Sequence, residues 1–204
     1  MDLFAFKLIP VVVIHDVHDA EPLARALIKG GLPIAEVTFR TDAAAEAIDI
    51  MAEIAGITVG AGTVLTPAQV EIAAEAGAQF FVSPGLRADV VREAQVAGKP
   101  MLPGAVTPSE IMQAMSMGLD TVKFFPADIY GGPAAIKALS APFTTMRFVP
   151  TGGVTAKNLG EYLSLKSVPA VGGSWMVPAK LIEAKKFDEI AALCAEAVSL
   201  ASHF

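Results

Sequence analysis

The chain has 204 residues, of which 53% are hydrophobic and 18% charged, so it can bury a sizeable core and is too apolar to be disordered. Its net charge of −6 and its lack of a basic stripe argue against a nucleic-acid-binding or anionic-membrane-binding surface. The single cysteine, Cys194, excludes an intramolecular disulfide and fits a reducing cytoplasm, and it is expected to be a small buried hydrophobe.

The N-terminal region lacks the basic segment and cleavage site of a signal peptide, and its apolar run at 9–14 is too short to span a bilayer. From there, short apolar runs alternate with amphipathic stretches. In the first half of the chain, strands are predicted at 8–15, 33–39, 57–64 and 79–85, followed by helices at 19–31, 41–56, 66–77 and 87–98. Thr41 or Asp42 is expected to cap the second helix, and Thr66 with Pro67 to begin the third.

The second half repeats the pattern. Strands are predicted at 100–106, 121–127, 145–153 and 168–175, and helices at 107–118, 131–141, 155–165 and 187–204. The strands are apolar on both faces, as expected when helices cover the sheet. Eight such units in about 200 residues predict an α/β fold, a parallel (β/α)₈ TIM barrel, as a single domain over residues 1–204. A doubly wound open sheet is the alternative, although the segment 60–65 has only two glycines of a dinucleotide fingerprint.

Active sites of (β/α)₈ barrels lie at the carboxyl ends of the strands, so polar residues there are the first candidates. At the end of the second strand, alternation places Glu36, Thr38 and Arg40 on one face. If that face is the interior, a carboxylate and a guanidinium enter the barrel, where charges are costly unless they are paired or used. An internal ion pair without chemistry, Glu36 with Arg40 or with Lys123, remains open.

Lys123 lies within an apolar strand, which is rare for lysine, and alternation places Phe125 on the same face. Burial disfavours the charged form of an amine, and a neutral amine is what imine formation with a carbonyl substrate requires. The alternative is a surface lysine that extends its charged end into water. The apolar flanks of Lys123 favour the buried nucleophile.

Small residues end three other strands. Gly60, Gly62 and Thr63 end the third strand, where small residues let a ligand approach closely, but taken alone they are better explained by a tight turn. Glycine pairs end the seventh and eighth strands, in the segments Thr151–Gly152–Gly153 and Gly172–Gly173–Ser174. Loops at these two positions are the usual phosphate site of this fold, so a phosphorylated substrate is predicted. The three histidines show no metal-ligand spacing, and no metal site is expected.

Seven motifs together resemble a known family, the bacterial 2-keto-3-deoxy-6-phosphogluconate (KDPG) aldolases, also described as 4-hydroxy-2-oxoglutarate (KHG) aldolases. In order along the chain they are EVTFRT, VGAGTVL, FVSPGL, LPG, KFFPA, PTGG and GGSW. The resemblance covers nearly the whole chain, from residue 8 to residue 179. It implies a class I aldolase on a (β/α)₈ barrel that works without metal or cofactor and assembles as a homotrimer in the cytoplasm.

The resemblance also implies roles for individual residues. Lys123 would form the Schiff base and Glu36 would shuttle protons. The remaining matches are Arg40 and Thr63 for the pyruvate carboxylate, Pro84, Phe125 and Thr151 in the pocket, and Gly152, Gly153, Gly172, Gly173 and Ser174 for phosphate. The activity implied is cleavage of KDPG to pyruvate and D-glyceraldehyde 3-phosphate, with cleavage of 4-hydroxy-2-oxoglutarate to pyruvate and glyoxylate as an expected second activity.

Two features bear on specificity. A related branch that acts on the galactonate-derived epimer tends to lack the arginine of the E-V-T-x-R motif, so Arg40 and Thr151 favour the gluconate type. Tyr130 stands where other members often have Asn, which leaves the chemistry intact and the fine substrate preference open. Two competing functions are a phosphosugar isomerase that forms no imine and a non-catalytic phosphate-ligand binding protein in which Lys123 only balances charge.

Overall fold

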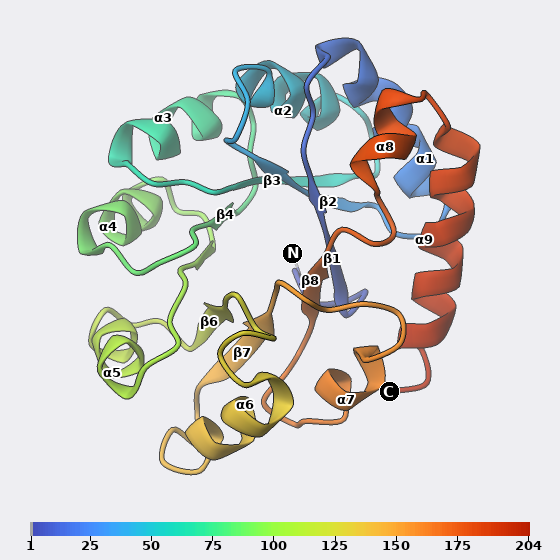
Figure 1. The fold of residues 1–204 in the computed structure, drawn as a ribbon. Coiled ribbons are helices and arrows are strands. Elements are labelled where there is room, and N and C mark those ends of the chain that lie inside the picture. Colours follow the sequence, from blue (N-terminus) through green and yellow to red (C-terminus); the bar gives the residue numbers. More distant parts are fainter. Residues whose placement is uncertain (1) are drawn as a thin grey trace.

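The structure is a computed structural model that describes residues 2–204, and Figure 1 shows its ribbon. The strands are β1 (Leu8–Val12), β2 (Ile34–Thr38), β3 (Thr58–Gly62), β4 (Phe81–Val82), β5 (Met101–Leu102), β6 (Thr121–Phe124), β7 (Arg147–Pro150) and β8 (Val171–Gly173). The helices that alternate with them are α1 (Ala20–Lys29), α2 (Ala44–Ala52), α3 (Pro67–Glu75), α4 (Ala88–Val96), α5 (Pro108–Ser116), α6 (Gly132–Ser140) and α7 (Leu159–Leu163). The strand β8 is followed by α8 (Ala179–Glu183) and α9 (Phe187–Ala201).

The strands form a closed parallel ring. One sheet has the order β5-β4-β3-β2-β1-β8, and β6 pairs with β7 in a second sheet. Isolated parallel bridges, Gly104 to Lys123 and Thr151 to Gly172, join the two sheets at both junctions. In Figure 1 the helices surround the strands. The predicted (β/α)₈ barrel is therefore confirmed, and the doubly wound open sheet is wrong.

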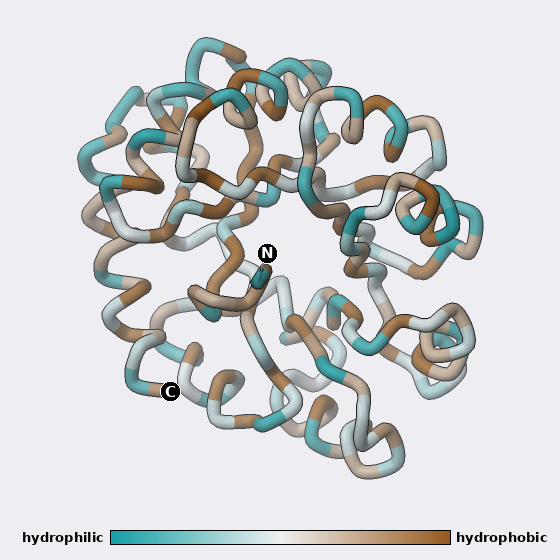
Figure 2. The backbone as a smooth tube through the Cα atoms, turned by 180° about the vertical axis from the view of Figure 1, so that it is seen from behind, coloured by the Kyte–Doolittle hydropathy of each residue, from teal (hydrophilic) through white to brown (hydrophobic). Residues whose placement is uncertain are grey.

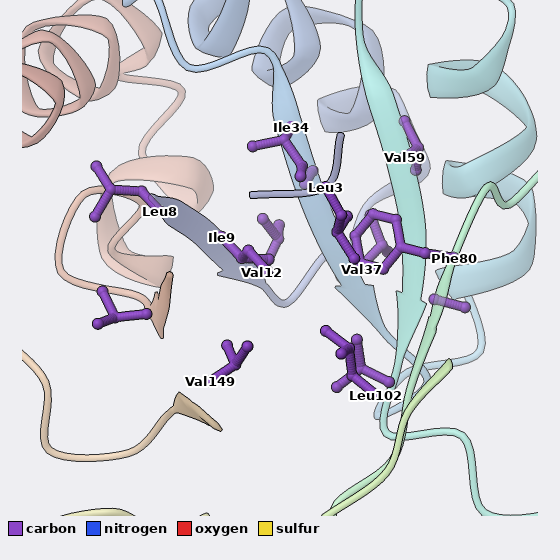
Figure 3. Packing of buried hydrophobic residues seen from close by; sticks show 14 of the residues in the cluster. Leu3, Leu8, Ile9, Val12, Ile34, Val37, Val59, Phe80, Leu102 and Val149 are labelled. Carbon is purple, nitrogen blue, oxygen red and sulfur yellow. The ribbon is translucent and has the colours of Figure 1, made fainter. Parts of the chain in front are cut away.

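Apolar side chains fill both faces of the strands. All five residues of β1 and all five of β2 are buried, and Figure 3 shows Leu8, Ile9 and Val12 packed among side chains from neighbouring strands. Each such side chain contributes about 1.5–3 kcal/mol when fully buried. The continuous apolar runs of the sequence therefore reflect burial between the barrel interior and the helix layer. Figure 2 shows the matching mixture of polar and apolar positions along the outer helices.

Two helices begin as their sequences predict. The Thr66 hydroxyl accepts a hydrogen bond from Gln69 N, with Pro67 in the first helical turn of α3. At α5, Thr107 forms a reciprocal capping box with Glu110. Partial burial acts to raise the pKa of Glu110, but hydrogen bonds from Val106 N and from the hydroxyl and N–H of Thr107 outweigh it and lower that pKa. These caps fix where α3 and α5 start relative to the strands before them.

The predicted cap of α2 is wrong. The N-cap residue is Ala43, with no side-chain hydrogen bond, and the helix begins at Ala44. Thr41 instead donates its hydroxyl proton to the Ile14 carbonyl, 2.6 Å away, beyond the end of β1. Thr41 therefore joins two loops at the carboxyl end of the barrel. A cross-loop acceptor of this kind has no local sequence signal.

The strands β4 and β5 are only two residues long, although the sequence predicted seven for each. Ser83 and Pro84 already belong to the loop after β4. The structure also contains a short helix, α8, and a 3₁₀ turn at Val17–Asp19, neither of which has a clear apolar period in the sequence. Cys194 lies fully buried, as expected, and burial raises the pKa of its thiol to about 12.

The N-terminal segment lies at the amino ends of the strands, opposite the predicted site. Leu3 and Phe4 border a cavity of about 370 Å³ together with Met101 and Thr121, and the Arg147 guanidinium lies 5.4 Å from the centre of the Phe4 ring. In Figure 2 the N-terminal segment lies within the outline of the ring. No helix between residues 2 and 204 is long and apolar enough to cross a membrane.

Lys185 joins the turn after β1 to the end of α8. Its ammonium donates to Asp16 at 3.0 Å and also to the buried Asp19 carboxylate. Hydrogen bonds from His18 and Lys185 hold the pKa of Asp16 far below its ordinary value of 3.8. A carboxyl group whose pKa is lowered by folding stabilises the native state above the unfolded pKa, and this stabilisation is lost as the pH falls through the folded pKa.

We expect Lys185→Met to lower the melting temperature at pH 7, with a difference from the wild type that shrinks as the pH falls below 3.8. The measurement is thermal unfolding from pH 7 to pH 3. Lys180→Met is the matched control, because Lys180 is an exposed lysine of α8 with no ion pair among the described residues. A difference that stayed constant over this range would contradict the proposed link to Asp16.

Candidate active site

Lys123 and Glu36 meet inside the barrel, although they come from β6 and β2, 87 positions apart in the chain. The Lys123 Nζ lies 3.2 Å from Glu36 Oε1. Lys123 is 5% exposed and Glu36 2% exposed. Each buried charge is costly on its own, so the geometry keeps both as a pair. An amine and a carboxylate held this close can pass a proton directly between them.

The backbone around Lys123 fixes the direction of its side chain. Its N–H donates to the Pro103 carbonyl and its carbonyl accepts from Ala105 N, both at 2.9 Å. The segment after β5 therefore pairs with β6 at Lys123, as a parallel strand would. The Phe125 ring centre lies 5.2 Å from Nζ, close enough for a cation–π interaction. Phe125 is therefore on the Lys123 side of the barrel, as alternation predicts.

Glu36 has room for its carboxylate because the neighbouring strand carries glycine. In the register of β2 with β3, Glu36 aligns with Gly60, and its side chain extends over Gly62. A Cβ atom on Gly62 would lie 2.4 Å from Glu36 Oε1 and 2.6 Å from its Cγ. The residue that is two positions further along, Thr38, donates its hydroxyl proton to the Val12 carbonyl at 2.9 Å. Gly62 therefore forms the surface on which Glu36 rests.

We expect Gly62→Ala to displace the Glu36 carboxylate and lower the catalytic rate roughly tenfold to a hundredfold, since a shift of about 1 Å in an active-site group can cost that much. The measurement is the turnover number of the purified variant. Its affinity for the substrate should change less, because the atoms nearest to the added methyl group outside the adjoining residues all belong to Glu36.

Gly85→Ala is the matched control for this prediction. A Cβ atom there meets nothing within 4 Å and the backbone is not left-handed, so the added methyl group should leave the rate unchanged. A Gly62→Ala variant with full turnover would show that Glu36 keeps its place without the glycine, contrary to the close packing described above.

A cavity of about 220 Å³ opens at the carboxyl ends of β6, β7 and β8. Arg40 is the one charged residue in its lining over the described part of the chain. Phe125 also lines it and so connects this cavity with Lys123. The predicted site residues in the lining are Arg40, Phe125, Thr151, Gly152, Gly153, Gly173 and Ser174.

The two glycine turns lie side by side in this cavity. Thr151 bridges to Gly172, and a Cβ atom on Gly172 would lie 2.3 Å from the Thr151 Oγ1. Gly152 has a φ of 89° and Gly153 a φ of 77°, both in the left-handed region that favours glycine. Because neither turn carries a bulky side chain, an anionic group can approach the backbone N–H groups closely.

Three predicted residues lie elsewhere than expected. Arg40 follows the end of β2, which is Thr38, so the strand does not carry it into the interior, and it is exposed at the cavity. Thr63 and Pro84 do not line the 220 Å³ cavity. Thr63 directly follows Gly62 and has a φ of 56°, which residues other than glycine seldom adopt.

Pro84 lies near the backbone of Lys123, through Gly104. A Cβ atom on Gly104 would lie 2.0 Å from the Pro84 carbonyl oxygen, and Gly104 is the residue that bridges to Lys123. Pro84 thus lies beside the backbone that pairs with Lys123, and Thr63 adjoins Gly62, on which Glu36 rests, while Arg40 and the glycine turns border the cavity. Tyr130 is 52% exposed and does not line the 220 Å³ cavity.

Sequence reasoning missed several contributors. Val11, Val13, Val154 and Val177 line the cavity, but an apolar residue in an apolar run gives no signal of such a role. In the sequence, Gly62 indicates only a small residue at the end of a strand. Within residues 2–204, no group of three or more His, Cys, Asp or Glu side chains is arranged to hold a metal ion.

The chain is similar to known proteins over nearly its whole length. The family of KDPG and KHG aldolases matches residues 2–193 of the chain. A 2-dehydro-3-deoxy-phosphogluconate aldolase of Treponema pallidum is 50% identical over 195 residues, which cover 95% of this chain and 93% of the relative.

Two solved structures share the fold at full length. KDPG aldolase from Legionella pneumophila, with pyruvate captured as a covalent carbinolamine, matches with a TM-score of 0.92 and 41% identity, covering 95% of both chains. The KDPG aldolase of Zymomonas mobilis with 3-phosphoglycerate matches with a TM-score of 0.90 and 43% identity, covering 98% of this chain and 96% of that one. The family match, the identities and the complete barrel agree, and this chain belongs to the KDPG and KHG aldolase family.

Proposed function

We propose that this protein is a class I aldolase that cleaves KDPG to pyruvate and D-glyceraldehyde 3-phosphate through a Schiff base on Lys123. The observation that carries the proposal is the buried pair of Lys123 and Glu36, with 3.2 Å between Nζ and Oε1. An amine held beside a proton acceptor in an apolar interior suits carbinolamine and imine formation. The pyruvate carbinolamine captured in the Legionella pneumophila relative supports this chemistry.

In the first half of the proposed reaction, Lys123 loses its ammonium proton to solvent, and the neutral amine attacks the C2 carbonyl of the substrate to form a carbinolamine. A proton from solvent then joins the carbinolamine hydroxyl group, which leaves as water, and the product is an iminium, which is an electron sink. Glu36, through a water molecule, takes the proton of the C4 hydroxyl group. The electrons of the C3–C4 bond then move to the iminium, and D-glyceraldehyde 3-phosphate leaves as the aldehyde. What remains on Lys123 is the enamine of pyruvate.

In the second half, Glu36 returns a proton to C3 of the enamine, which restores the iminium. Water adds to C2, the carbon–nitrogen bond breaks, and pyruvate and the Lys123 amine are released. Each step needs one proton donor or acceptor near Nζ, and the distance from Glu36 supports this assignment.

The anionic ends of the substrate require complementary groups. We assign the carboxylate to Arg40 and Thr63, because guanidinium binds carboxylate through two parallel hydrogen bonds that lysine does not reproduce. Pro84, Phe125 and Thr151 complete the pocket. The phosphate is assigned to Gly152, Gly153, Gly172, Gly173 and Ser174, most of which line the 220 Å³ cavity. The 3-phosphoglycerate bound in the Zymomonas mobilis relative supports a phosphorylated ligand.

Turnover of the two family substrates tests this function. We expect pyruvate release from both KDPG and 4-hydroxy-2-oxoglutarate, with a higher kcat/KM for KDPG because only KDPG reaches the glycine turns. Pyruvate release can be followed by coupled oxidation of a nicotinamide cofactor. A protein that binds phosphate esters but releases no pyruvate from either substrate would instead be a non-catalytic binding protein.

We also propose that the chain acts as one domain and assembles as a homotrimer in the cytoplasm. Large apolar side chains on the surface near α3, such as Leu65 and Ile72, which are 45% and 47% exposed, support an association surface. The buried thiol of Cys194 is compatible with a reducing compartment. Sedimentation at micromolar concentration should give three times the chain mass, whereas a monomer would contradict the trimer.

A further inference from the structure

We propose that Asn158 is a positioning residue, which holds the first glycine turn in shape for the substrate phosphate and so favours phosphorylated over unphosphorylated substrates. This inference rests on the proposed function. Asn158 lies just before α7, five positions after Gly153, and is half-buried. Its side chain faces the turn rather than the cavity, so it acts on the ligand only through the backbone.

The Asn158 amide makes two opposite hydrogen bonds. Its Nδ2 donates to the Gly153 carbonyl at 2.9 Å, and its Oδ1 accepts from Thr155 N at 2.8 Å. The Thr155 hydroxyl also donates to Oδ1, at 3.3 Å. A backbone N–H can only donate, so Thr155 N must face the oxygen, and the NH₂ group then faces the Gly153 carbonyl. The Asn158 side chain thus connects two backbone groups of the loop between β7 and α7, the Gly153 carbonyl and the Thr155 N–H.

The loop after β6 supports the same turn from the other side. Asp128 N donates to the Gly152 carbonyl at 3.2 Å, and Ala127 N donates to the Thr151 carbonyl at 2.8 Å. The Asp128 carboxylate packs against Gly153, where a Cβ atom would lie 2.4 Å from Oδ2. Residues 151–153 are therefore held between Asp128 and Asn158. Removal of Asn158 frees one side of a turn whose two glycines can adopt many other conformations.

Loss of Asn158 should weaken phosphate binding without affecting the chemistry at Lys123. The glycine turn borders the cavity proposed for phosphate, whereas Lys123 and Glu36 are held by β6, β2 and Gly62. A loosened turn presents its N–H groups poorly and binds phosphate less tightly. The reactions of pyruvate at Lys123 need no phosphate contact and should be unchanged.

The test compares Asn158→Leu, which removes all three hydrogen bonds of the side chain at similar volume, with Asn158→Asp, which keeps the acceptor but loses the donor to Gly153. In both variants we expect KM for KDPG and the inhibition constant of inorganic phosphate to rise roughly fivefold to tenfold, a change on the scale of one or two hydrogen bonds. Exchange of the pyruvate methyl protons and KM for 4-hydroxy-2-oxoglutarate should stay within about twofold. Glu161→Gln, an exposed change in the first turn of α7, should match the wild type in all four measurements.

Three results would overturn the inference. Equal losses for KDPG and for pyruvate exchange would make Asn158 a purely structural residue, and unchanged KM in both variants would remove it from the site. A loss confined to Asn158→Asp would reflect added negative charge rather than positioning. A wild-type protein that releases no pyruvate from KDPG would contradict the proposed function itself, and this result is separate from the behaviour of the variants.

Discussion

Replacing Lys123 by methionine should lower the turnover of KDPG by at least about 10⁴-fold, because the substituted side chain cannot form the imine on which both halves of the reaction depend. Methionine keeps a similar length and apolar stem in a position that is only 5% exposed. The measurement is pyruvate release at saturating substrate, with enough enzyme to detect the residual rate. A variant that retains wild-type turnover would remove Lys123 from the chemistry.

Loss of activity must be separated from loss of structure, because Lys123→Met leaves the Glu36 carboxylate buried and unpaired. Breaking a buried ion pair from one side destabilises proteins by about 3–5 kcal/mol. We expect the double variant with Glu36→Gln to recover most of that stability, since it removes the isolated charge, while remaining inactive. Thermal unfolding of the two variants distinguishes the effects. Activity that returned together with stability would indicate that Lys123 is structural.

Glu36→Gln should leave imine formation with pyruvate intact and slow exchange of the pyruvate methyl protons by about 10²–10⁴-fold, the usual contribution of a positioned acid or base. Glutamine has nearly the same shape and can still accept a hydrogen bond from Lys123, so the geometry at 3.2 Å is largely preserved. The two measurements are borohydride trapping for the imine and proton NMR in D₂O for exchange.

Exchange at the wild-type rate in Glu36→Gln would assign the proton transfer to another group. The smaller effect expected from Gly62→Ala has the same origin, since both changes act on one carboxylate. The two effects should therefore be less than additive in the double variant, as for residues in direct contact. Fully additive losses would mean that Gly62 acts independently of Glu36.

Much of the barrel could be predicted from sequence because its signals are local. Apolar runs, the Thr-Pro helix starts at Thr66 and Thr107, and the repeated strand–helix order each follow from residues close in the chain. The failures involve distant partners. Thr41 looks like a cap but bonds Ile14 across two loops, and the 3₁₀ turn before α1 is held partly by Lys185, far along the chain.

In the site too, residues with a local signal could be predicted, whereas contacts between distant residues could not. Lys123 could be singled out because lysine in an apolar strand is unusual, and the glycine turns because two occur at expected positions. The distance between Lys123 and Glu36 depends on how the ring closes, which no local pattern encodes. Gly62 and Asn158 are similarly ordinary in sequence. Their importance comes from what the fold places against them.

The central claim is that Lys123 forms an imine with the substrate, and trapping with pyruvate and borohydride tests it most directly. Reduction should add one pyruvate-derived group to the protein, and peptide mass spectrometry should locate it on Lys123. Protein treated with borohydride alone is the control. Trapping that left Lys123 unmodified while pyruvate was still released from KDPG, or an adduct on a different lysine, would contradict the mechanism.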